Sequence, residues 1–197
     1  MKITNPFWVL LTLCLSFFIA SCGDDTTTDD TTATATTLPT TGNPAVDGLT
    51  AKIQENPSDA SLYAHRAGAW IDMEGYDEAI ADLNQAIMLD STQPVYFHEL
   101  SNVYLDYYRS RMAMLTMEKA AELFPQNILT LLKTAEVQLI LKQYERALYS
   151  LERIRTIEPA NSEMFFMFGR VFEEMGRIDE AKGAYQNALE QNSELVD

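Results

Sequence analysis

The sequence predicts an all-α fold in which pairs of short helices repeat along the chain and stack into a solenoid. Alanine recurs at a constant step of 34 residues, at Ala79, Ala113, Ala147 and Ala181. Large apolar residues follow the same step in other columns, of which one begins at Tyr63 and another at Leu83. Within each step, apolar residues three and four positions apart mark two amphipathic stretches, which is the spacing of one face of an α-helix.

Four repeat units account for most of the chain, and they cover 60–93, 94–127, 128–161 and 162–195. Gly75 separates the two helices of the first unit, and we expect Gly176 to have the same role in the fourth. The second unit has Tyr108 and Arg109 where a glycine turn is expected. Prolines that stop one helix before the next fall between units, at Pro57, Pro125 and Pro159.

A half unit, residues 44–59, precedes the first repeat. Ala45 and Leu49 lie 34 residues before Ala79 and Leu83. We therefore expect residues 44–55 to form an N-terminal capping helix, which gives nine helices with the four pairs. The last helix combines an apolar stripe with a polar one, as a solenoid terminus needs for solubility.

The columns of this lattice resemble the tetratricopeptide repeat (TPR) over almost all of residues 44–197. The early large position of the family is filled by Tyr63, Phe97, Leu131 and Phe165. Its small position is filled by Ala67, Ser101, Ala135 and Gly169, and its next aromatic position by Trp70, Tyr104, Gln138 and Phe172. Gln138 departs from the aromatic pattern. The resemblance implies a TPR-type α-solenoid, a right-handed superhelix of four helix-turn-helix repeats plus the cap, whose first helices line a concave groove that binds proteins.

Residues 1–21 are expected to be a lipoprotein signal peptide. Lys2 precedes an apolar run from Phe7 to Ala20, which as a helix reaches about 21 Å and is too short to cross a bilayer. The run ends in Ile19-Ala20-Ser21-Cys22, which resembles the bacterial lipobox. We expect cleavage before Cys22 and lipidation of its thiol and new amine, because two or more acyl chains anchor a protein firmly. A plain secretory signal with an incidental cysteine is the alternative.

Residues 22–43 are expected to be the lipidated cysteine and a disordered tether. Of the 21 residues at 23–43, ten are threonine, four are aspartate and none is basic or aromatic. Such a segment cannot bury enough apolar surface to fold. Together these features predict a lipid-anchored protein of the bacterial cell envelope, in the outer membrane, on its periplasmic face or at the cell surface. The start Cys22-Gly23-Asp24-Asp25 resembles an acidic surface-export signal, and the alternative is that the aspartates only solubilise the tether.

The formal charge of −15 argues against nucleic acid as a partner, because phosphate binding needs a basic surface. The sequence has no glycine-rich nucleotide loop and no assembled catalytic set, so we expect a protein that is not an enzyme and uses no cofactor. His65 and His98, on neighbouring first helices, leave one enzymatic alternative, a metal-dependent hydrolase. Plain contact residues are the favoured interpretation of both histidines.

The resemblance places a set of apolar and mostly acidic residues on the groove side of the first helices. The candidate binding residues are Ile71, Asp72, Val95, His98, Glu99, Asn102, Leu105, Leu129, Leu132, Lys133, Glu136, Phe166, Met167, Arg170 and Glu173. An apolar floor with acidic walls suits a peptide or a basic amphipathic helix. The predicted function is therefore a membrane-anchored, non-catalytic protein-interaction scaffold.

Two further alternatives remain open at this point. The repeats could leave the groove empty and join a larger assembly through their edges. Alternatively, exposed aromatic residues such as Tyr107, Tyr108 and Phe166 could bind a glycan or another surface ligand. For the tyrosines of the second unit, the favoured interpretation is a helix extended by one turn and packed on its neighbour.

Overall fold

The computed structural model describes residues 40–192, and these residues form nine α-helices and no strand. The helices are α1 (Pro44–Glu55), α2 (Ala60–Ile71), α3 (Tyr76–Leu89), α4 (Pro94–Asp106), α5 (Ser110–Leu123), α6 (Ile128–Ile140), α7 (Tyr144–Ile157), α8 (Ser162–Glu174) and α9 (Ile178–Gln191). The expected all-α TPR-type solenoid is confirmed, and the helix expected at 44–55 is present with those bounds.

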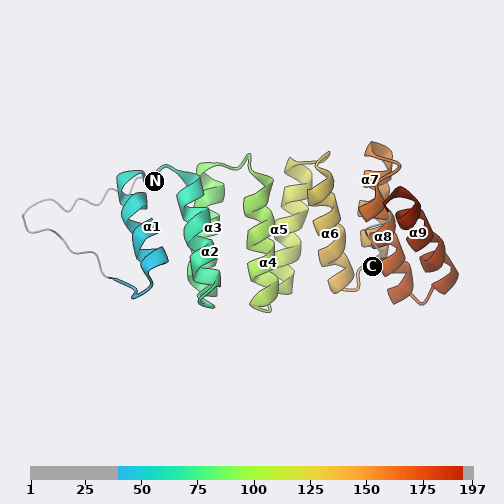
Figure 1. Ribbon diagram of the computed structural model, residues 1–197, viewed down its shortest axis with the longest axis horizontal. Coiled ribbons are helices and arrows are strands. Elements are labelled where there is room, and N and C mark those ends of the chain that lie inside the picture. The colour runs from blue at the N-terminus through green and yellow to red at the C-terminus, as the bar shows by residue number, and fades with distance from the viewer. Residues whose placement is uncertain (1–39, 193–197) are drawn as a thin grey trace, which may run out of the picture. The chain divides into compact units, whose positions relative to one another are not determined.

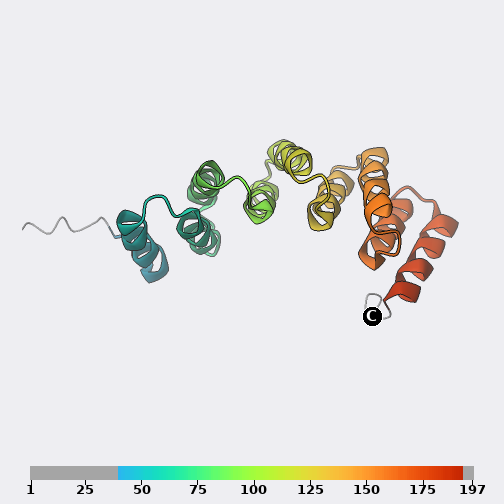
Figure 2. The same ribbon diagram turned by 90° about the horizontal axis from the view of Figure 1, so that it is seen from above.

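The helices follow one another in space in the order of the chain (Figure 1). Each helix packs against the next, and α6 also contacts α4 and α8. Seen from above, α2, α4 and α6 lie in one layer and α3, α5 and α7 in the other (Figure 2). We call the side formed by α2, α4, α6 and α8 the first-helix face. No helix within residues 40–192 is long and apolar enough to cross a membrane.

Helix starts repeat with the period of the sequence. The first helices of the four units begin at 60, 94, 128 and 162, a step of 34. The residue before three of them caps the helix through its side chain, because Asp59, Asn127 and Asn161 accept hydrogen bonds from backbone N–H groups of the first turn. Pro94 starts the remaining first helix, where its missing N–H is not needed.

The turn inside each unit has one residue in the left-handed conformation. These residues are Glu74, Tyr108, Lys142 and Gly176, with φ of 58°, 57°, 56° and 74°. In each turn the next N–H donates to a carbonyl five residues earlier, as from Gly75 to Trp70 at 2.8 Å, which closes a Schellman motif. The expectation that Gly75 and Gly176 separate the paired helices of their units is confirmed, since each lies between the two helices. Their positions within the turn differ. Gly75 has φ −78° and precedes α3, one position after the left-handed residue.

The expectation that one more turn extends the helix before Tyr107 is wrong, because α4 ends at Asp106 and a tight turn follows. The packing part of that expectation holds for Tyr107. Its ring stacks on Tyr76 with centroids 5.4 Å apart, and its hydroxyl donates to Asp77 at 3.1 Å. Tyr108 instead is 94% exposed, so this side chain contributes little packing.

The core lies between the two layers and is filled by the columns that the repeat predicts. Each signature alanine is buried at 4% exposure or less, and the large column residues Leu83, Met117 and Leu151 are fully buried. In the fourth unit Tyr185 takes the place of these three, and its larger ring is accommodated by Gly169. A Cβ on Gly169 would lie 2.4 Å from Cε1 of Tyr185, so glycine is required by space there.

The predictions on the N-terminal segment concern residues outside the described range. The signal peptide, Cys22 and most of the tether fall before residue 40, and they remain predictions.

Candidate functional site

Polar side chains of neighbouring first helices interact on the first-helix face. Glu99 of α4 lies near His65 of α2, and burial raises the pKa of Glu99 while His65 partly offsets that rise. His98 of α4 contacts Thr130 of α6. Glu136 of α6 faces Arg170 of α8 at 3.9 Å. Direct polar contacts therefore join α4, α6 and α8 on this face.

His98 is held neutral inside this surface. Its Nε2 lies 2.9 Å from Oγ1 of Thr130, which donates in turn to Oδ1 of Asn127. That oxygen also accepts from the Thr130 N–H at 2.8 Å, and an amide oxygen can only accept. The hydroxyl proton of Thr130 therefore points to Asn127, so Oγ1 of Thr130 accepts from His98 and Nε2 is the donor. Burial, and secondly the charge of Lys133, lower the pKa of His98 to about 4. No local sequence pattern indicates this chain of hydrogen bonds.

A hollow of about 290 Å³ opens between α6 and α8 on the same side. Ile140 and Leu139 line its apolar part, and Lys142 and Arg170 bring positive charge. Glu173 and Glu174 bring negative charge to the α8 wall. The space is suited to a side chain from a partner more than to a whole small molecule, because ligand pockets usually enclose about 300–1,000 Å³.

Acidic side chains follow the C-terminal ends of the first helices. Asp72, Asp106 and Glu174 occupy one repeat column, and all three are exposed. Ile140 fills the same column in the third unit and is 52% exposed. Carboxylates at a helix C-terminus oppose the helix dipole and cost about 0.3–1 kcal/mol each, so helix stability does not explain this row.

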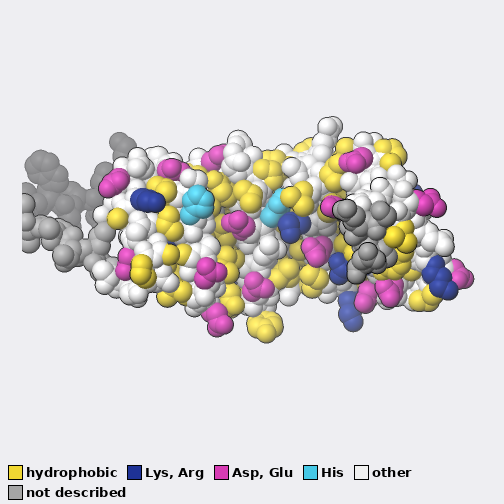
Figure 3. Space-filling model, in the orientation of Figure 1, with side chains coloured by type: hydrophobic (Ala, Val, Ile, Leu, Met, Phe, Trp, Pro, Cys, Tyr) yellow, Lys and Arg dark blue, Asp and Glu magenta, His cyan; other side chains and the backbone are white. Residues whose placement is uncertain are grey.

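Exposed apolar side chains lie at the other end of the same helices. Val95 of α4 and Leu129 of α6 share one repeat column and are 47% and 54% exposed. Figure 3 shows this face, on which hydrophobic and acidic side chains are interspersed over the middle helices. The combination on this face is apolar and acidic.

The fifteen candidate binding residues differ in how far they can reach a partner. Exposed are Asp72, Val95, Asn102, Leu129 and Glu173. Intermediate in exposure are Ile71, Glu99, Leu105, Lys133, Glu136, Phe166 and Arg170. Buried are His98, Leu132 and Met167. Leu132 and Met167 belong to the core between the third and fourth units, and their side chains support the face from beneath.

Two of the candidates turn toward α9. Phe166 packs on Tyr185 with ring centroids 5.6 Å apart, and Glu173 accepts a hydrogen bond from the Tyr185 hydroxyl at 2.7 Å. Their availability to a partner therefore depends on α9 as well as on the first helices.

Within residues 40–192, no cluster of three or more His, Cys, Asp or Glu side chains could hold a metal ion.

Comparison with known proteins agrees with this architecture. The family model of the tetratricopeptide repeat matches residues 162–194. Among solved structures, the chain is similar to MamA, with a TM-score of 0.63, 18% identity, and coverage of 76% of this chain and 87% of MamA. It is similar to YrrB, described as a TPR protein with an unusual peptide-binding site, with a TM-score of 0.61, 15% identity, and coverage of 76% and 77%.

A third similar structure is TTC0263, a thermophilic TPR protein of Thermus thermophilus. The TM-score is 0.61 at 21% identity, and the match covers 77% of this chain and 84% of that protein. Nine helices with a 34-residue step over the described residues, a matched repeat at 162–194 and these similar folds lead to one conclusion. The chain carries a tetratricopeptide repeat within a solenoid of that same fold.

Proposed function

We propose that this protein is a non-catalytic scaffold that binds a basic, amphipathic segment of a partner protein on its first-helix face. The observation that carries the proposal is the acidic row Asp72, Asp106 and Glu174, placed where it costs helix stability and next to exposed Ile140. A partner that brings lysine or arginine to the row and apolar side chains to Val95 and Leu129 would offset that cost. The peptide-binding site named for YrrB supports the same use of the fold.

The test uses two helical peptides with the same leucine pattern, one with lysine and one with glutamate on the polar face. Fluorescence anisotropy should show binding of the lysine peptide only, with an affinity that falls as salt rises. The triple variant Asp72→Asn, Asp106→Asn, Glu174→Gln should weaken that binding about tenfold, since each pair contributes about 0.5 kcal/mol.

A matched variant neutralises three exposed acids of the second helices, Glu78→Gln, Glu145→Gln and Glu190→Gln. It removes the same net charge, so it should reproduce any weakening that comes from the total charge of the protein. It should not reproduce the weakening that comes from contacts with the acidic row. Equal weakening by both triple variants would contradict the proposal. A photocrosslinker at exposed Leu129, compared with one at exposed Met88 of α3, then identifies the partner.

We also propose that the scaffold is anchored to the bacterial cell envelope through Cys22, with residues 23–43 as the spacer. This part rests on the lipobox-like sequence alone. In cells, a Cys22→Ser variant should lose incorporation of an alkyne-labelled palmitate and move from the membrane to the soluble fraction. Labelling that persists in Cys22→Ser would refute the anchor and leave the binding proposal unaffected.

A further inference from the structure

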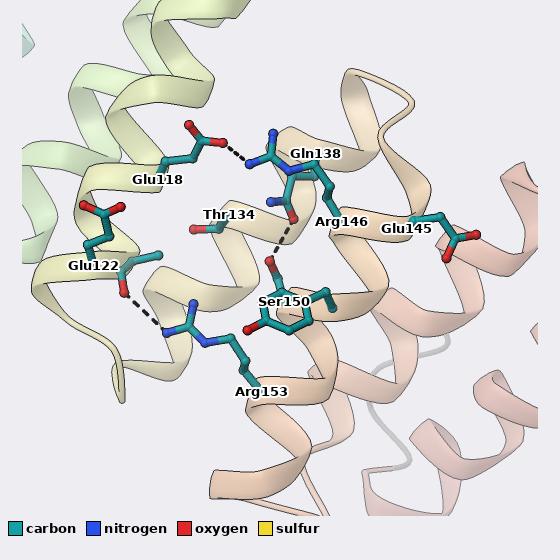
Figure 4. Close-up of a pocket in the computed structure, with 10 residues that line it drawn as sticks. Glu118, Glu122, Thr134, Gln138, Glu145, Arg146, Ser150 and Arg153 are labelled. Carbon is teal, nitrogen blue, oxygen red and sulfur yellow. Dashed lines mark hydrogen bonds and ion pairs between the residues drawn. The ribbon is translucent and has the colours of Figure 1, made fainter.

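A second cavity lies on the opposite side, between α5 and α7 and above α6. We call it the α5–α7 cavity; it encloses about 590 Å³ and is lined by Glu118, Ala121, Glu122, Thr134, Gln138, Glu145, Arg146, Tyr149, Ser150 and Arg153. Figure 4 shows its polar side chains. This volume is within the range of pockets that hold small ligands, so a side chain of a partner also has room to enter it.

An equivalent cavity lies between each of the other pairs of neighbouring second helices, and there its volume is much smaller. The α3–α5 equivalent encloses about 200 Å³ and the α7–α9 equivalent about 280 Å³. The floor of the former is Leu100 and Tyr104, and the floor of the latter is Phe168 and Phe172. Shifted by 34 residues, these positions are Thr134 and Gln138 in the α5–α7 cavity. Two short polar residues thus replace a bulky apolar pair only in the third unit.

At the first interface, between α1 and α3, a side chain of the protein itself occupies the corresponding place. Arg66 stands in the column of Thr134, and its Nε and Nη2 donate to Asp82 at 2.7 Å each. Its Nη1 donates to Thr50 at 3.0 Å. A planar hydrogen-bonding group is therefore a demonstrated filling for this site in the fold.

The floor of the α5–α7 cavity presents a hydrogen-bond donor with no partner. Gln138 is 4% exposed, and its Oε1 accepts from Oγ of Ser150 at 2.8 Å. Its Nε2 has no acceptor among the described residues. Every fully buried side-chain N or O atom in these residues has a hydrogen-bond partner, so Nε2 of Gln138 is not fully buried. The Nε2 group must therefore reach open space, and the cavity that Gln138 lines provides it.

The two walls have opposite hydrogen-bonding character. The α7 wall supplies donors, because Arg153 uses only Nη2, toward the carbonyls of Ala121 and Pro125, and keeps its other N–H groups. The α5 wall supplies acceptors, since Glu122 has no ion-pair partner in residues 40–192. Glu118 is paired with Arg146, so it adds no net charge. Glu145 points away from the other side chains in Figure 4.

A ligand that fits must accept hydrogen bonds on one side, donate them on the other, and carry no net charge. We propose that the α5–α7 cavity binds a primary amide, the side chain of an asparagine or glutamine of a partner protein. Its carbonyl accepts from Gln138 Nε2 and Arg153, and its NH2 group donates to Glu122. A carboxylate would gain Arg153 but meet Glu122, and an ammonium group would gain Glu122 but meet Arg153, so neither ion satisfies both walls.

The test compares four capped amino acids that differ only in the side-chain terminus. N-acetyl-glutamine N-methylamide is the ligand probe, and the glutamate, lysine and leucine analogues are the comparisons. In NMR titrations of the chain, the glutamine probe should shift the side-chain NH2 signals of Gln138, with a dissociation constant at least fivefold lower than for the other three. Methyl glucoside is added as a separate arm, because sugars also combine donors and acceptors.

The variant Gln138→Phe with Ser150→Ala copies the pair Phe172 and Ala184 of the next interface, so it should fold while it closes the cavity. Binding of the glutamine probe should fall at least fivefold in this variant. The control Asn187→Ala, in the α7–α9 equivalent, should leave binding unchanged. Equal binding of the leucine analogue, stronger binding of the glucoside, no shift at Gln138, or unchanged binding in the filled variant would each overturn the proposal. None of these outcomes depends on the first-helix face.

Discussion

The stability of the solenoid should fall between pH 7 and pH 5 through one residue, His98. Its pKa is lowered from 6.5 to about 4, because the fold buries the ring and keeps it neutral. The unfolded chain therefore takes up a proton first as the pH falls. The contribution of neutral His98 is fully present above pH 6.5 and is lost progressively down to pH 4.

The size of the effect follows from the shift. A change of 2.5 pKa units corresponds to about 3 kcal/mol at most, and about 2 kcal/mol of it is lost by pH 5. Carboxylates also titrate in this range, so the informative quantity is a difference between variants. His98→Gln keeps an amide donor near Oγ1 of Thr130 but cannot be protonated.

The assay is urea unfolding of the wild type and of His98→Gln at pH 7 and pH 5. We expect the free energy of unfolding of the wild type to drop about 2 kcal/mol more than that of the variant. His65→Gln is the matched control, because His65 is exposed and belongs to the preceding unit. Equal drops in the wild type and His98→Gln would refute the assignment of the pH dependence to the buried ring.

Three further predictions concern stability, each measured as a change in the free energy of unfolding in urea. Tyr108→Gly should stabilise by about 0.5–1 kcal/mol, because φ is 57° there and the side chain is 94% exposed; a loss of stability would contradict the left-handed turn. Gly169→Ala should cost about 1–2 kcal/mol, since the new Cβ would meet the Tyr185 ring, and adding Tyr185→Leu should restore most of it; additive effects in the double variant would refute this compensation. Asp82→Ala should cost about 3 kcal/mol, because Arg66 loses both hydrogen bonds of its fork; Ala81→Ser, at an exposed neighbour, should change stability by less than about 0.5 kcal/mol.

The arrangement of the helices was predictable from the sequence because a fixed period determines where each helix begins. The capping helix at 44–55 follows from the same reasoning, since its apolar residues continue the columns one step earlier. The conformation of the turns was harder to predict. Three of the four left-handed residues in the turns within units are not glycine, so glycine alone does not mark these positions.

Exposure on the first-helix face was harder to predict than helix position. A rotation of about 100° per residue separates a surface side chain from a core one, so neighbours such as Leu132 and Lys133 differ in burial. The burial of His98 depends on Thr130, a residue 32 positions later, and no local pattern shows such a contact. The α5–α7 cavity is likewise formed by residues of α5, α6 and α7 that are far apart in the sequence, and no local pattern shows that they meet.

The repeat supplies its own reference for separating stability from function. Where one column changes and a second compensates, as with Gly169 and Tyr185, packing explains both residues. At Gln138 the aromatic ring is lost and Ser150 satisfies only one end of the amide, so the compensation is incomplete. The remaining donor, Nε2, has no acceptor in the described residues and reaches the open cavity, where water or a ligand can accept its hydrogen bond. The α5–α7 cavity, where the repeat leaves a hydrogen-bond donor without a protein acceptor, is therefore the position at which a bound ligand would stabilise the protein most.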